Sequence, residues 1–182
     1  MKKKILIAAA ATVILFTAAL TASAQVRLDI DLNWPVIGGI QLDPTIFGTS
    51  GSSIDLSQYH LLLPDLRLYY QFGEGFLQAG IGIRAYTLII ESLVFPEAFI
   101  EMNLKPFVIS ASVGGYLFGV IGIANTGSTA DLILPDVSAY WAINNWFRIG
   151  GGVLMFAPLD ASWTQNFGYV GYFGAKFSFL FK

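Results

Sequence analysis

The sequence contains no cysteine, a single histidine and few charges, and each shortage excludes a class of site. Without cysteine the chain can form no disulfide bond, no thiolate metal site and no cysteine nucleophile. The one histidine, His60, has no cluster of metal ligands behind it, so neither a metal nor a cofactor is expected. Charged residues make up 12% of the chain, against roughly 25% in typical domains, while hydrophobic residues make up 55%. Something other than cross-links must stabilise this chain.

Beyond residue 24 the sequence also lacks an apolar run of the roughly 20 residues that a membrane-spanning helix needs. The one long apolar run, residues 5–20, follows three lysines and precedes an Ala-Ser-Ala motif that ends at Ala24. This layout is typical of a cleavable secretory signal peptide read by the Sec export pathway. We therefore expect residues 1–24 to be a signal peptide and residues 25–182 to form one domain.

Basic residues are scarce in the expected domain. Three of the ten lysines and arginines lie before residue 25, which leaves seven basic residues against 12 acidic ones, a net charge of −5. A nucleic-acid partner is not expected, because such binding needs clustered basic residues. A chain this hydrophobic without membrane helices either buries a soluble core or faces lipid as a barrel.

Alternation of apolar with polar or small residues predicts eight β-strands. They are residues 26–33, 65–72, 76–88, 96–104, 107–118, 136–143, 146–156 and 168–182. The connections alternate between tight turns, at 73–75, 105–106 and 144–145, and longer links, at 34–62, 89–95, 119–134 and 157–167. With both ends of the domain on the tight-turn side, this is the layout of an outer-membrane barrel, and we expect the last strand to pair with the first.

A soluble lipocalin-like barrel also alternates, with its apolar face inward, so the orientation of the faces must be decided separately. All five basic residues predicted in strands share one parity with most strand glycines, and the concave side of a small barrel favours small residues. The charged face is therefore expected inside. The predicted interior network, which would also line any pore, comprises Arg27, Asp29, Asp31, Asp65, Arg67, Arg84, Glu97, Glu101, Asp136, Arg148 and Lys176. Because the last strand is expected beside the first, Lys176 is expected to pair with Asp29 or Asp31.

Aromatic residues near the strand ends suggest two interfacial rims, as in barrels that span membranes. One rim is expected to comprise Phe72, Phe76, Phe107, Trp146, Phe179 and Phe181. The other is expected to comprise Trp34, Phe95, Phe156, Trp163 and Tyr169.

The Phe-rich last segment, with Phe173, Phe177, Phe179 and Phe181 on one parity, resembles the C-terminal signature of bacterial outer-membrane β-barrels. In size and layout residues 25–182 are similar to the OmpA-transmembrane, OmpX and OmpW-like group. The resemblance implies an all-β fold, an eight-stranded antiparallel up-and-down transmembrane barrel in the outer membrane. It also implies lipid and the barrel-assembly machinery as partners, the latter through the last strand.

Two functions remain open from the sequence. The first is a structural or surface-interaction barrel with a charged interior filled by side chains, in which the loop 38–60 would contact an extracellular ligand. The second is a narrow pore for small solutes lined by the inward charges. An enzyme is not expected, because a nucleophile without a positioned base is not a site. We expect a monomer.

Overall fold

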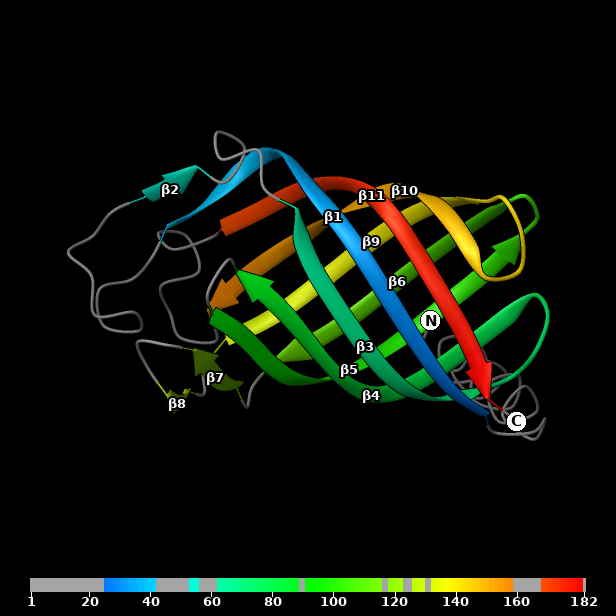
Figure 1. The fold of residues 1–182 in the computed structure, drawn as a ribbon, viewed down its shortest axis with the longest axis horizontal. Coiled ribbons are helices and arrows are strands. Elements are labelled where there is room, and N and C mark those ends of the chain that lie inside the picture. Colours follow the sequence, from blue (N-terminus) through cyan, green and yellow to red (C-terminus); the bar gives the residue numbers. More distant parts are fainter. Residues whose placement is uncertain are drawn as a thin grey trace, which may run out of the picture.

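The computed structural model is a closed antiparallel β-barrel of eight long strands (Figure 1). It describes residues 25–41, 53–55, 62–88, 91–115, 118–122, 126–129, 132–158 and 168–181. The expected signal peptide, His60 and Trp163 lie outside the described residues. No helix among the described residues is long and apolar enough to cross a membrane.

The long strands follow one another around the barrel in chain order. They are β1 (Gln25–Gln41), β3 (Leu63–Phe72), β4 (Leu77–Leu88), β5 (Glu91–Leu104), β6 (Phe107–Gly115), β9 (Leu132–Ala142), β10 (Phe147–Pro158) and β11 (Gly168–Phe181). Three short strands, β2 (Ser53–Asp55), β7 (Phe118–Gly122) and β8 (Thr126–Thr129), extend the sheet at one end. The predicted fold class is confirmed.

The barrel closes where β1 pairs with β11, as predicted. The two strands run antiparallel from Val26 opposite Phe181 to Gly39 opposite Tyr169, and they lie side by side in Figure 1. This seam leaves neither terminal strand as an open edge, so its backbone N–H and C=O groups are paired within the protein.

The two ends of the barrel differ in their connections. Tight turns at residues 73–76, 105–106 and 143–146 lie at the end that also holds the C-terminus, while β2, β7 and β8 lie at the opposite end (Figure 1). In the last tight turn, the side-chain oxygen of Asn144 accepts hydrogen bonds from the backbone N–H groups of Trp146 and Phe147, at 2.9 and 2.8 Å. An asparagine side chain that caps the backbone in this way favours a turn. We call the two ends the turn end and the loop end.

The first strand is longer than the alternation predicted. Trp34 and Pro35 were expected to end it, yet β1 continues to Gln41, with a register shift between Pro35 and Ile37. A bulge at this point accommodates proline, which has no N–H to donate to the ladder. The strand β2, which pairs with the end of β1, lies within the segment predicted as the loop 38–60.

Two other segments that were predicted as links also contain β-strand residues. Residues 91–95 belong to β5 and pair with β4, so the link predicted at 89–95 is much shorter. The link predicted at 119–134 contains β7, which pairs with both β5 and β8. These pairings lengthen the barrel wall at the loop end.

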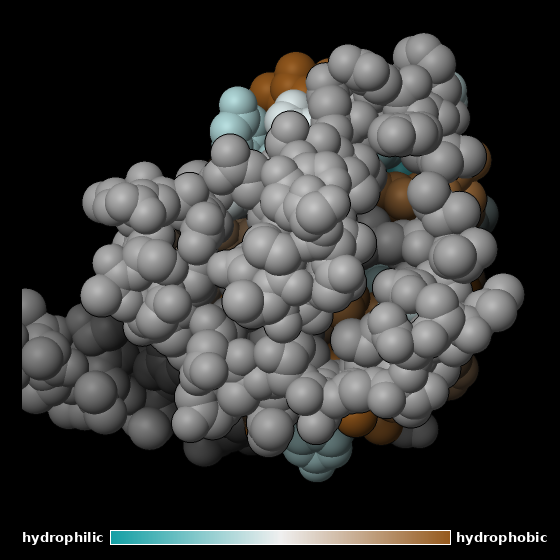
Figure 2. Space-filling view, turned by 90° about the vertical axis from the view of Figure 1, so that its left-hand side faces the viewer, coloured by the Kyte–Doolittle hydropathy of each residue, from teal (hydrophilic) through white to brown (hydrophobic). Residues whose placement is uncertain are grey.

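The exterior of the barrel is apolar. Outward residues such as Leu68, Ile81 and Val113 expose 53%, 59% and 49% of their surface, whereas every charged strand residue whose side chain the structure describes is buried. Figure 2 looks at the loop end and shows hydrophobic strand residues at its margin. A continuous apolar surface of this kind suits contact with hydrocarbon and is far larger than a soluble monomer exposes.

Candidate functional site: the charged interior

All 11 residues predicted for the interior network point into the barrel. Their exposed fractions run from 0% for Asp31, Asp65 and Arg84 to 7% for Arg148. They come from seven of the long strands, and the eighth, β6, contributes Ser112, which donates a hydrogen bond to Glu97. The structure thus brings the predicted residues together in one interior, where their function as a pore lining stays a prediction.

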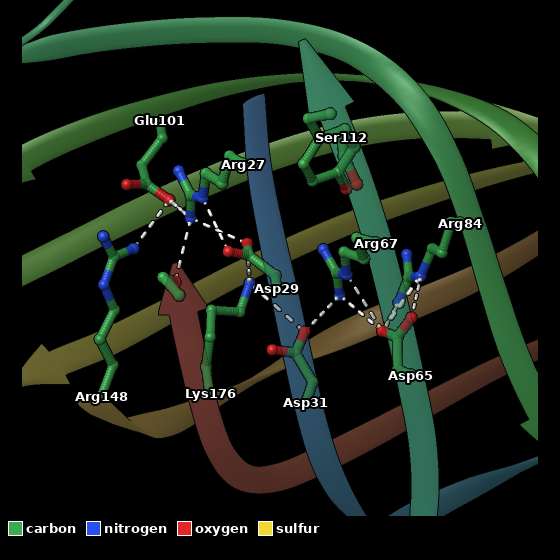
Figure 3. Close-up of polar contacts among 12 residues, drawn as sticks. Arg27, Asp29, Asp31, Asp65, Arg67, Arg84, Glu101, Ser112, Arg148 and Lys176 are labelled. Carbon is green, nitrogen blue, oxygen red and sulfur yellow. Dashed lines mark hydrogen bonds and ion pairs between the residues drawn. The ribbon is translucent and has the colours of Figure 1, made fainter. Parts of the chain in front are cut away.

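Ion pairs join ten of these residues in a single chain of alternating charge, and Figure 3 shows the part from Arg148 to Arg84. From the turn end it begins with Arg148, Glu101 and Arg27, with nitrogen–oxygen distances of 2.9 and 3.0 Å. It continues through Asp29, Lys176, Asp31, Arg67, Asp65, Arg84 and Glu97. The predicted pairing of Lys176 with Asp29 or Asp31 is present with both, at 3.8 and 3.4 Å.

The eleventh residue, Asp136 on β9, closes the network across the lumen. Its carboxylate lies 2.9 Å from Arg84 and 3.4 Å from Arg67, which stand on strands of the facing wall. Tyr172 donates a hydrogen bond to the other oxygen of Asp136, at 2.8 Å. Cross-lumen pairs of this kind tie opposite walls together and fill the space between them.

The geometry of the arginines explains why charges are tolerated in this interior. Arg27 donates to both oxygens of Asp29, at 2.7 and 2.8 Å, and Arg84 donates to Asp65 through two nitrogens. The forked guanidinium group suits such paired bonds, and buried charges are stable only when they are paired and hydrogen-bonded. Tyr69 also donates a hydrogen bond to Glu97.

A second, apolar layer fills the lumen toward the loop end. It consists of buried residues from six long strands: Leu63, Tyr86, Leu93, Phe95, Leu134, Leu154, Phe156, Val170 and Tyr172. These residues lie near the ends of their strands that face the long connections. Arg84, at the edge of the charge network, stacks on this layer with its guanidinium carbon 5.5 Å from the Tyr86 ring. This apolar layer was not predicted from the sequence.

The predicted rim at the loop end was therefore wrong in two places. Phe95 and Phe156 are 1% and 6% exposed and belong to the apolar layer inside the barrel. Trp34 and Tyr169 do point outward, with exposed fractions of 42% and 44%. At the turn end, outward rings gather as predicted: Phe107 packs edge-on against Trp141 at 5.1 Å, and Trp146 stacks on Phe177 at 6.1 Å.

No protein-family model and no curated protein sequence matches this chain. A structure with a similar fold is the N-terminal β-barrel domain of OprF from Pseudomonas aeruginosa, with 12% identity and a TM-score of 0.45, covering 86% of this chain and 100% of that one. Another is Neisserial surface protein A, with 10% identity and a TM-score of 0.47, covering 85% and 95%. A third is Ail, the attachment invasion locus protein of Yersinia pestis, with 8% identity and a TM-score of 0.36, covering 86% and 99%. These neighbours are small eight-stranded outer-membrane β-barrels.

The interior arrangement pairs opposite charges. Each interior carboxylate has at least one cationic partner within 4 Å. Among the described residues there is no group of three or more side chains suited to hold a metal ion.

Proposed function

We propose that this protein is an integral β-barrel of a bacterial outer membrane, with its turn end toward the periplasm and its loop end toward the medium. The apolar exterior supports this proposal, because a sheet can lie in hydrocarbon only when its backbone is fully paired and its outward side chains are apolar. The N-terminal segment with the features of a Sec signal is consistent with export. The recognition of the Phe-rich last strand by the barrel-assembly machinery stays a prediction.

Within that membrane, the proposed role is structural or surface-interacting, through the segments at the loop end. The observation that carries this proposal is the connected ion-pair network that crosses the lumen, with the apolar layer beside it. An eight-stranded barrel has an interior just wide enough for side chains to fill, so these two layers leave little room for a solute path. The loop 38–60 is the proposed contact surface for an extracellular ligand, and no enzymatic activity is proposed.

Conductance across a planar bilayer distinguishes this role from the narrow pore. Wild-type protein that is folded, as shown by a heat-dependent shift in electrophoretic mobility, should give no discrete openings. A Glu101→Ala variant removes the carboxylate that bridges Arg27 and Arg148 at 3.0 and 2.9 Å, and it should remain silent because the apolar layer is unchanged.

Discrete wild-type openings whose conductance changes in an Arg148→Glu variant would support the pore instead. Arg148 suits this comparison because it is the most exposed of the network residues, at 7%. An outward substitution on the same strand, Ile149→Leu, serves as the control, since it alters no lumen residue and conserves side-chain volume.

A further inference from the structure

The turn end of the barrel contains a cavity of about 840 Å³ whose charged lining residues are all basic. These are Arg27, Lys105 and Arg148, and no carboxylate is among the residues that line the cavity in the described part of the chain. We call this cavity the vestibule. A lining whose charged residues are all basic contrasts with the net charge of −5 of the expected domain.

Neutral hydrogen-bond donors complete the lining of the vestibule. Side chains with amide or hydroxyl groups come from four different segments around it: Gln78, Asn103, Asn144, Asn145 and Ser178. Guanidinium, ammonium, amide and hydroxyl groups together form the donor set that proteins use for carboxylate and phosphate groups.

The carboxylates nearest to the vestibule lie behind its arginines and leave the positive charge on the vestibule side. Glu101 and Asp29 are each only 1% exposed. Arg27 already donates hydrogen bonds to these two acids and to Gln71, so few of its donors remain for a ligand. Arg148 has Glu101 as its ion-pair partner, at 2.9 Å, and its guanidinium group has further donors.

Lys105 stands at the rim, in the turn between β5 and β6. It is exposed and forms no ion pair with another described residue. The one acidic side chain of the neighbouring turn, Glu74, accepts a hydrogen bond from Gln25 and does not line the vestibule. Lys105 and Arg148 are therefore the two cations placed to meet a ligand that enters from the turn end.

We propose that the vestibule binds a small oxyanion, a phosphate or carboxylate group, through Arg148 and Lys105 with the neutral donors around them. Such a group can be carried by a free solute or by the headgroup of an anionic lipid in the adjacent leaflet, and both present the same chemistry. Binding at this place does not require the lumen to conduct, because the vestibule is lined by residues of the turn end.

Calorimetric titration of the folded protein with inorganic phosphate and with succinate, in a zwitterionic detergent at low salt, tests the proposal. We expect saturable binding that weakens as salt increases. Lys105→Gln should weaken binding about two- to fivefold, as for an exposed charge, and Arg148→Gln about tenfold or more, as for a buried charged donor. Arg148→Lys, which keeps the charge, should weaken it less than Arg148→Gln.

Glu74→Gln is the matched control, because it removes a charge from the same end at a residue that does not line the vestibule, and it should not weaken binding. All variants are checked for the heat-dependent mobility shift, so that a misfolded variant is not read as a binding defect.

Repeating the titration in nanodiscs separates the two sources of the oxyanion. Equal affinity in phosphatidylcholine and phosphatidylglycerol discs indicates a free solute, and lower affinity in phosphatidylglycerol discs indicates competition by the lipid headgroup. An absence of saturable binding in the wild type, or equal binding by wild type, Lys105→Gln and Arg148→Gln, would overturn the proposal.

Discussion

Replacing Arg84 by leucine is expected to destabilise the folded barrel by about 3–5 kcal/mol. The guanidinium group is fully buried and lies within 3.0 Å of Asp65, Glu97 and Asp136. Its removal leaves carboxylates buried with too little compensating positive charge. Removing one partner of a buried ion pair in this way costs more stability than replacing both partners by apolar residues. The measurement is the urea midpoint of unfolding in detergent micelles, followed by tryptophan fluorescence.

The adjacent residue supplies the control for this prediction. Ile83 points outward and is 54% exposed, so Ile83→Leu conserves volume and should cost less than about 1.5 kcal/mol. A double variant, Arg84→Leu with Asp65→Leu, should recover part of the loss because it also removes a carboxylate. Equal midpoints for Arg84→Leu and Ile83→Leu would show that the network contributes nothing to stability.

The second large effect is expected at the seam, where Gly174→Val should prevent β1 and β11 from closing the barrel. Gly174 lies opposite Asn33 on β1. A Cβ atom at this glycine would overlap the backbone oxygen of Leu32 and come within 2.9 Å of the Asn33 side-chain oxygen. Backbone cannot yield as a flexible side chain can, so we expect a loss of about 3 kcal/mol or more, at the upper end of the cost of overpacking.

Electrophoresis without heating measures this outcome, because a closed barrel migrates differently before and after heating. Ala175→Val adds a comparable volume one residue along, on the outward parity, and should leave the heat-dependent shift intact. If Gly174→Val shows the same shift and the same urea midpoint as Ala175→Val, a side chain at position 174 does not clash with β1 and this prediction is wrong.

The faces of the barrel could be predicted from the sequence because a strand alternates sides strictly. Arg27, Arg84 and Lys176 share their parity with most strand glycines, which placed them on the concave, inner face. Adjacency of the first and last strands was then sufficient to pair Lys176 with Asp29 or Asp31. The contact of Asp136 with Arg67 was not predictable in the same way. It crosses the lumen, and its partner depends on the stagger of the strands and on side-chain length.

The apolar layer and the strand ends were missed for different reasons. Phe95 shares its parity with Glu97, and Phe156 shares its parity with Arg148, so the alternation of each strand places both rings inside. They were predicted in a rim because they lie near strand ends, and that criterion gave the wrong result. The extension of β1 past Pro35 depends on a bulge, and the extension of β5 to Glu91 depends on its pairing with β4 and β7. Neither the bulge nor these pairings can be recognised from the local alternation of apolar and polar residues.

The central claim is that the apolar face of this sheet contacts lipid and the polar face lines the interior. Val137 and Ser138 are neighbours on β9 that are 51% and 4% exposed, and the absence of cysteine allows each to be replaced singly by cysteine. When the cysteine at 137 is labelled with a fluorescent maleimide in the unfolded protein, where its thiolate is available, and the protein is then folded into vesicles, nitroxide lipids should quench the attached dye. The cysteine at 138 should stay unreactive until the barrel is unfolded. A dye at 137 quenched by aqueous iodide but not by nitroxide lipids, or ready labelling at 138 in the folded protein, would contradict the account.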